Sequence, residues 1–332
     1  MKFLVTALLI SLLVSMGEFN ANAGRQEPAL KLSFDNSAAR YVLENPTRAL
    51  AAQRDTIWNS FEGYRITLVW HEASSFPVTW EIWDRGLKRF LEDTSLIRKT
   101  LELADSLKIK AQRERDLIAQ HISSYLNTKA AIDASVYFVA FTTPYAFCVE
   151  QNKIGIDITA EEWSFDTDCI LNTVIHEIYH VGFRMNSPDY HYIKNDPVDE
   201  ETFIRFCYAY LQSEGMATYV SYKALGLFPS DYKHTDFDLL EDDSQVKKAF
   251  SYIGMLLDDA KTLAIDSLLK EAWNVGVSER AFYLAGAHMA RVLEEKHGSE
   301  FLAGLVSKGS LEFAREYNAI ATNDYAIALM PF

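Results

Sequence analysis

The chain has 332 residues and a formal net charge of −14, with 46 acidic against 32 basic side chains. So acidic a composition argues against nucleic acid or an anionic membrane surface as a partner. Three cysteines, Cys148, Cys169 and Cys207, are too few for a disulfide scaffold, and no Cys-x-x-Cys pair is present to hold a metal. We therefore expect a globular protein with a large core, in which an odd number of cysteines leaves at least one thiol free or all three buried and reduced.

The first 23 residues resemble an export signal. Lys2 gives a short positive region, Phe3 to Val14 is an apolar run, and Ala21-Asn22-Ala23 offers small residues where a signal peptidase cuts. The apolar run is shorter than the roughly 20 residues that cross a bilayer. We predict a signal peptide over residues 1–23 with cleavage after Ala23. The mature protein would be secreted or periplasmic and have no membrane span, and the alternative is an uncleaved N-terminal anchor.

Residues 24–134 are predicted to form a mostly helical N-terminal region. A short strand is expected over residues 30–34, and helical spacing of apolar residues covers residues 38–59 and 78–127. Pro46 should break the first of these stretches. In the second, aromatic and aliphatic residues recur at steps of three and four, which predicts one buried helix face. These residues are Trp80, Trp83, Leu87, Phe90 and Leu91.

The pattern changes to strands at Ser135. Residues 135–142 are rich in β-branched and aromatic side chains, and a second run at 147–149 is followed by a polar turn and a third run at 153–158. These runs predict a hairpin or a small sheet. From Asp166 onward the pattern is helical, with helices expected over residues 166–184, 198–225, 238–270, 279–297 and 299–316.

The predicted fold class is therefore α+β and mostly α. We expect a small sheet to pack on the helix of residues 166–184, within a catalytic region that spans residues 135–332. In that region residues 135–184 supply the sheet and the first helix, and residues 185–332 supply a helical remainder.

The helix of residues 166–184 contains the sequence His176-Glu177-Ile178-Tyr179-His180. Residues four apart on a helix differ by about 40° in direction, so His176 and His180 can bind one ion. Glu177 flanks that pair, where a general base could take a proton from a zinc-bound water. The helix itself carries apolar residues around most of its circumference, so we expect it to be buried. Polar groups buried with it need partners. One Zn²⁺ would satisfy all three side chains, whereas the alternative is a chance pair of histidines.

A catalytic zinc ion usually has three protein ligands, so one more is needed. Position 186 is Asn, which excludes the metzincin pattern, and His191 lies in a polar loop and is expected at the surface. Glu214 is the preferred ligand because it lies on the core-facing side of an apolar helix. Gly215 beside it permits close packing. Glu200 and Glu201 remain as alternatives, although acidic residues in a first turn also stabilise a helix dipole.

The pattern of His176, Glu177 and His180 followed by Glu214-Gly215-x-Ala217 resembles the gluzincin metallopeptidases. It is most similar to exported bacterial proteins described as zinc-dependent peptidases, over roughly residues 135–320. The resemblance implies a peptide or protein substrate, held along an edge strand that precedes the metal helix. Residues 153–158 are suitably placed for that strand, and a plain core strand is the alternative.

A peptidase also needs a donor to the oxyanion that develops during attack. Tyr283 and His288 lie on an otherwise apolar helix beside Gly286, and they differ in direction, so only one of them is expected to serve. Tyr219 is a third option. The competing functions are a catalytically degenerate relative that binds peptides and an exported scaffold with a chance motif. Retention of Glu177 favours the enzyme, because a peptide-binding protein does not need a base.

Overall fold

The structure is a computed structural model that describes residues 30–51, 54–74, 80–126, 132–149, 152–160, 165–230, 235–322 and 325–327. Most of the described residues are helical, and four strands among them form one mixed sheet, which confirms the α+β, mostly α, fold class. The signal peptide and its cleavage site lie outside the described residues. None of the described helices is long and apolar enough to cross a membrane.

The sheet has the strand order β1, β2, β4, β3. Strands β1 (Leu30–Asp35) and β4 (Lys153–Asp157) flank β2 (Ile132–Val139) and both run parallel to it, whereas β3 (Ala146–Val149) runs antiparallel to β4. The expected hairpin of the second and third runs is therefore present. Strand β4 is interior, so the segment expected to bind substrate along an edge is a core strand. Strand β3 forms the edge on that side of the sheet, and β1 forms the other edge.

Side chains of the sheet alternate between two packing environments. Val136 and Phe138 of β2 are fully buried in the main core, whereas Tyr137 between them packs against a smaller cluster with Ile66 and Phe147. Ile66 belongs to α5 (Glu62–Ser74), which therefore covers the Tyr137 face of the sheet. The same helix ties itself to β4 through an ion pair between Glu62 and Lys153 (2.5 Å).

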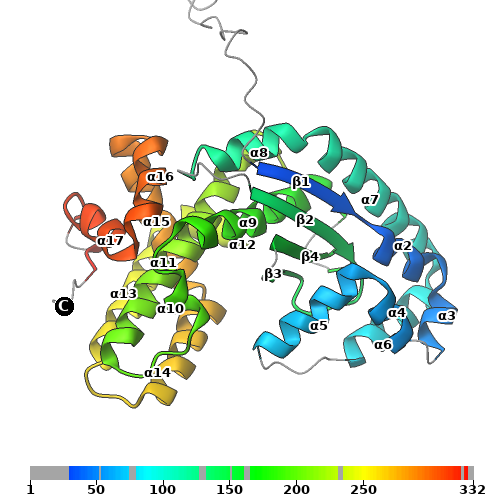
Figure 1. Cartoon of the computed structure of the whole chain (residues 1–332), viewed down its shortest axis with the longest axis horizontal. Coiled ribbons are helices and arrows are strands. Elements are labelled where there is room, and N and C mark those ends of the chain that lie inside the picture. Colours follow the sequence, from blue (N-terminus) through cyan, green and yellow to red (C-terminus); the bar gives the residue numbers. More distant parts are fainter. Residues whose placement is uncertain are drawn as a thin grey trace, which may run out of the picture.

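The N-terminal helices curve around the sheet (Figure 1). Pro46 separates the first two of them, as expected, and the buried face of α6 (Trp80–Glu92) carries Trp83, Leu87 and Phe90. The expected boundary at residue 135 falls inside β2, and β1 and these helices share one continuous core with the C-terminal helices. The N-terminal helices, apart from α5, are α2 (Ser37–Glu44), α3 (Pro46–Leu50), α4 (Arg54–Ser60), α6 (Trp80–Glu92), α7 (Thr94–Arg113) and α8 (Arg115–Ser123).

Three long helices form the centre of the C-terminal half. Helix α9 (Thr167–Asn186) packs on the sheet, α11 (Glu200–Lys223) packs on α9, and α15 (Ala281–His297) packs on α11 (Figure 1). Asp166 caps α9 by accepting hydrogen bonds from the backbone N–H of Asp168 (2.7 Å) and Cys169 (3.2 Å). This cap stabilises the first turn of α9 and fixes where the helix begins.

Two of the expected helices are divided. Asp242 caps a new helix inside the segment 238–270, and Gly309, with φ +94°, interrupts the segment 299–316. The resulting elements are α12 (Thr235–Glu241), α13 (Asp243–Asp259), α14 (Ile265–Glu271), α16 (Ser299–Lys308) and α17 (Ser310–Asn318). A short helix α10 (Tyr190–Lys194), a 3₁₀ turn η3 (Ala224–Gly226) and a π-helical segment η4 (Ala272–Ser278) complete the chain.

Candidate metal centre

Helix α9 carries the two histidines on one face. Its Ile175, Ile178 and Val181 are fully buried, so packing fixes the rotation of the helix about its axis. His176 and His180 project one turn apart, and their Nε2 atoms are 3.1 Å from each other. The sequence spacing therefore produces the expected convergence of two imidazoles.

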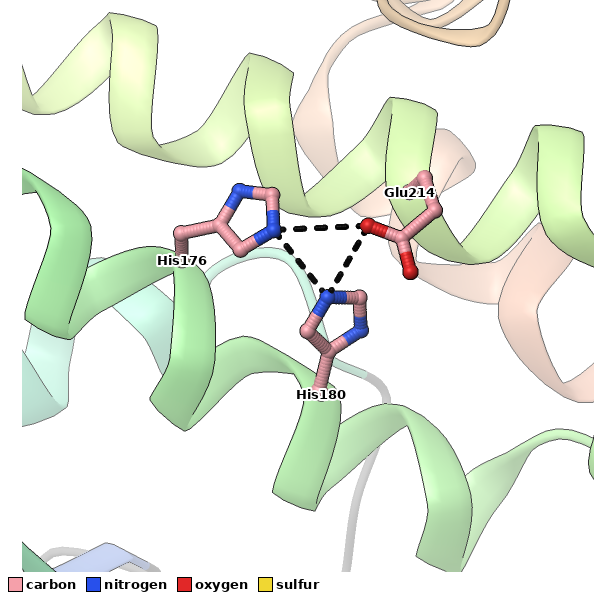
Figure 2. Close-up of side chains that lie close together, drawn as sticks. All are labelled: His176, His180 and Glu214. Atoms are coloured by element: carbon pink, nitrogen blue, oxygen red, sulfur yellow. Dashed lines mark hydrogen bonds and ion pairs between the residues drawn. The ribbon is translucent and has the colours of Figure 1, made fainter. Parts of the chain in front are cut away.

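Glu214 reaches the same point from α11. Its Oε2 lies 3.4 Å from Nε2 of His176 and 3.3 Å from Nε2 of His180 (Figure 2). Glu200 and Glu201 are exposed in the first turn of α11, about 20 Å from Glu214 along the helix axis. Of the three glutamates considered as third ligand, the structure brings only Glu214 to the histidines.

The three donor atoms fit one zinc ion. They lie within 4.8 Å of one another, and the three separations among Nε2, Nε2 and Oε2 are 3.1, 3.3 and 3.4 Å. In a tetrahedral site with zinc–ligand bonds of about 2.05 Å, neighbouring donors are about 3.3 Å apart. Two nitrogens and one oxygen, with the fourth position free, are also the donor set of a catalytic rather than a structural zinc site. His176, His180 and Glu214 could therefore hold one metal ion.

The electrostatics of the group favour a cation. Burial lowers the pKa of His176 to about 4, so this imidazole is neutral. Burial alone would raise the pKa of Glu214, but the charge of His180 and the hydrogen bonds of both histidines lower it below its usual range. For His180, burial is likewise outweighed by Glu214, and its pKa is raised. The Glu214 carboxylate therefore stabilises positive charge at the point where the two imidazoles converge.

Ser213 supports the His180 imidazole from behind. Its Oγ lies 3.1 Å from Nδ1 of His180. When Nε2 is directed at the metal position, Nδ1 carries the hydrogen and donates a hydrogen bond to the Ser213 hydroxyl. Such outer contacts hold a ligating histidine in one tautomer and orientation. Sequence analysis did not identify Ser213, although it precedes Glu214 directly.

A cavity of about 490 Å³ opens in front of the three donors. Glu177 lines it, is 8% exposed, and has its pKa raised to about 7 by burial. Tyr283 of α15 also lines it, with its ring stacked on His176 at a centroid distance of 6.2 Å and an angle of 13°. Two of the residues selected from the sequence for roles in the reaction, Glu177 and Tyr283, therefore border the same space as the metal ligands.

Tyr283 is held from its other side by Arg280. The guanidinium carbon lies 3.2 Å from the centroid of the Tyr283 ring. Asp236, itself buried, accepts a hydrogen bond from Arg280 Nε (2.8 Å) and a second one from Nη2. This cation–π contact and ion pair fix the tyrosine beside the donors.

The structure does not bring His288 to the metal group. Its imidazole stacks on Tyr325 at 4.7 Å and packs against Phe250 and Tyr317, on another side of α15 from Tyr283. Five helical positions separate the two side chains by roughly 140°, so the packing that directs Tyr283 inward turns His288 away. Tyr219 is also elsewhere, because its hydroxyl donates to Glu294.

His191 and the three cysteines lie outside the group of donors found among the described residues. His191 is exposed, with Nδ1 2.8 Å from the carbonyl of Pro188, as expected for a surface residue. All three cysteines are free thiols; Cys169 and Cys207 are buried, and Cys148 of β3 is half-buried and lines the cavity.

A helix with His-Glu-x-x-His, joined by a carboxylate from a second helix beside an open cavity, defines a candidate mononuclear site of the kind used by zinc-dependent hydrolases. The chain belongs to the family described as "Putative zinc dependent peptidase (DUF5700)", whose model matches residues 81–326. This range contains β2 to β4 and all three donor residues. No curated protein and no solved structure matched the chain.

Proposed function

We propose that this protein is an exported zinc metallopeptidase of the gluzincin type that uses Glu177 as its general base. The observation that carries the proposal is the convergence of His176 Nε2, His180 Nε2 and Glu214 Oε2 at 3.1–3.4 Å, from two separate helices. Membership of a family described as zinc-dependent peptidases supports a peptide as the substrate.

The chemistry divides between the ion and the protein. A bound zinc ion would polarise the scissile carbonyl and lower the pKa of an attacking water. Glu177 lines the cavity, where it accepts the proton of that water and passes it to the departing amine. Because Glu177 directly follows the ligand His176 on one rigid helix, its position relative to the donors is fixed before substrate enters.

Tyr283 is the proposed donor to the oxyanion. Its ring is clamped between His176 and the Arg280 guanidinium, which restricts where its hydroxyl can point. A donor that is already positioned needs no reorganisation when negative charge develops on the attacked carbonyl oxygen.

The edge strand β3 is the proposed peptide-binding edge. Its Ala146, Phe147 and Cys148 line the cavity, and its far side carries no strand partner within the described sheet. An extended peptide could add there by backbone pairing and so lay its scissile bond beside the donors. Residues 153–157 form the interior strand β4 and so do not provide this edge.

Export remains a proposal from the sequence of residues 1–23. Their short positive region, apolar run and small residues before position 24 support a cleaved signal and a secreted or periplasmic location.

The direct test compares zinc-loaded wild type with Glu177→Gln on a mixed peptide library, analysed by mass spectrometry. We expect cleavage by the wild type and a rate about 10²- to 10⁴-fold lower for the variant, with zinc content unchanged. Equal cleavage by both proteins would remove Glu177 as the base. Zinc and peptide binding without cleavage by the wild type would favour the degenerate peptide-binding alternative. Less than stoichiometric zinc that added metal does not restore would overturn the enzyme assignment.

A further inference from the structure

Arg184 extends the metal-facing side of α9 by one more turn. His176, His180 and Arg184 follow one another at four-residue steps, so their side chains leave the same face of the helix. At a rise of about 1.5 Å per residue, Arg184 lies roughly 6 Å beyond His180 along the axis. Its side chain lines the same cavity as the three donors. A guanidinium therefore borders the space where the peptide bond would be cleaved.

One nitrogen of this guanidinium lacks a hydrogen-bond acceptor among the described residues. Its Nη2 is buried, and among the residues that the structure describes nothing accepts a hydrogen bond from it. The guanidinium carbon lies 6.0 Å from the centroid of the Tyr190 ring, and the charge of the group acts through space on Glu177, whose pKa is raised by burial and lowered by this charge. A buried cationic nitrogen without an acceptor is unfavourable, and such groups persist where a ligand supplies the acceptor.

The second arginine at the cavity provides a contrast. Arg280 forms two hydrogen bonds with the buried carboxylate of Asp236, so the protein already neutralises its charge. Arg280 has a structural partner and a structural task, which is to hold Tyr283. Arg184, in contrast, has a buried Nη2 with no hydrogen-bond acceptor among the described residues. It lies one turn beyond His180 on α9, on the side away from His176.

We propose that Arg184 binds a carboxylate of the peptide substrate, located one or two residues from the bond that is cleaved. The inference rests on the proposed peptidase function and names its substrate class. A planar guanidinium matches a carboxylate with two parallel hydrogen bonds. An extended residue spans about 3.3–3.6 Å, so the offset of roughly 6 Å corresponds to one or two residues.

Two sources of carboxylate share this chemistry. One is the α-carboxylate of the last residue, which would make the enzyme release one or two residues from a C-terminus. The other is an Asp or Glu side chain beside the scissile bond, which would give an endopeptidase with an acidic preference.

Binding is measured first, so that recognition is separated from cleavage. Zinc-loaded Glu177→Gln protein is titrated with peptides in matched pairs, a free C-terminal acid against its amide and an internal Glu against Gln. We expect the carboxylate member of one pair to bind about 10- to 100-fold more tightly. Discrimination of the acid and amide pair identifies the C-terminus, and discrimination of the Glu and Gln pair identifies a side chain.

Added substitutions assign that preference to one residue. Arg184→Gln should abolish it, and Arg184→Lys should keep part of it. Arg205→Gln should leave it intact, because this substitution removes an equal charge outside the cavity, where Arg205 pairs with Glu201 (3.6 Å). Discrimination that persists in Arg184→Gln, or is absent from every pair, would overturn the proposal. So would a fall of several degrees in the melting temperature of Arg184→Gln, which would assign a structural role.

Cleavage assays separate this inference from the function on which it rests. If the wild type cleaves peptides equally well with and without the carboxylate, the peptidase function stands and the role of Arg184 is ruled out. If the zinc-loaded wild type binds the carboxylate member preferentially but cleaves no peptide, the carboxylate site stands and the peptidase function is ruled out.

Discussion

Gly215 and Gly286 face each other backbone to backbone where α11 and α15 cross. A Cβ atom on Gly215 would lie 2.3 Å from the Cα of Gly286, and one on Gly286 would lie 2.0 Å from the carbonyl oxygen of Leu211. Glu214 is the neighbour of the first glycine, and Tyr283 lies one turn before the second. The close crossing thus sets how far the third donor and the proposed oxyanion donor stand from α9.

Gly286→Ala should destabilise the protein strongly. The added methyl group meets backbone rather than a movable side chain, so the two helices must separate, at a cost of about 3 kcal/mol or more. Zinc affinity should fall with stability because Glu214 moves with α11. The control is Gly254→Ala in α13, where an added Cβ meets nothing within 4 Å. Helix propensity should make that variant more stable by up to about 1 kcal/mol. Thermal unfolding with and without zinc measures both, and equal stability of the two variants would contradict the argument.

Glu214→Gln should remove most of the zinc affinity. The change removes the negative charge of the carboxylate that faces the two imidazoles, while the side chain keeps nearly the same volume. We expect a loss larger than the roughly 10- to 100-fold that changes in outer contacts produce. Glu200→Gln is the matched control and should bind zinc like the wild type, because Glu200 is exposed in the first turn of α11. Competition titration with a chelator gives both constants, and a reversed order would reinstate Glu200.

Ser213→Ala should weaken zinc binding to an intermediate degree. The substitution removes the hydroxyl 3.1 Å from Nδ1 of His180, which then lacks this acceptor. An outer contact of this kind contributes about 10- to 100-fold in affinity. Metal titration of the variant measures the effect, and an affinity within twofold of wild type would show that another group orients His180.

Tyr283→Phe should lower kcat by about 10²- to 10³-fold, the range found when one oxyanion donor is removed. Zinc content should not change, because the ring that stacks on His176 remains. His288→Gln should leave kcat unchanged, since His288 packs with Tyr325, Phe250 and Tyr317 away from the cavity. Steady-state kinetics on one peptide test the pair. A greater effect of His288→Gln would return the donor role to that residue.

The sequence predicts the ligands well because they depend on short-range rules. Four-residue spacing on one helix brings His176 and His180 together, and a carboxylate on an apolar helix face indicated Glu214. Gly215 indicated a close approach, although its partner Gly286 could be recognised only from the packed helices. Strand β1 was likewise visible as a short apolar run, whereas its pairing with β2 depends on the whole fold.

The features that were missed depend on relationships between elements. No local pattern tells which strand of a hairpin lies at the edge, so residues 153–158 were given the position that β3 occupies. The choice between Tyr283 and His288 depends on how α15 is rotated against α11. Arg184 could have been found, because it continues the four-residue spacing of His176 and His180, but nothing in the sequence shows that its guanidinium lacks a partner.

The parallel pairing of β1 with β2 has a consequence for the order of folding. Register partners Leu30 and Ile132 are 102 residues apart, as are the hydrogen-bonded Ser33 and Ser135. Contacts between such distant residues form slowly, because a long loop must close before pairing stabilises it. During synthesis, β1 waits as an unpaired strand until β2 has emerged, and an unpaired strand can associate with another chain. Strand β1 therefore has no strand partner until about 100 further residues have been made, and it is most open to association with other chains over that interval.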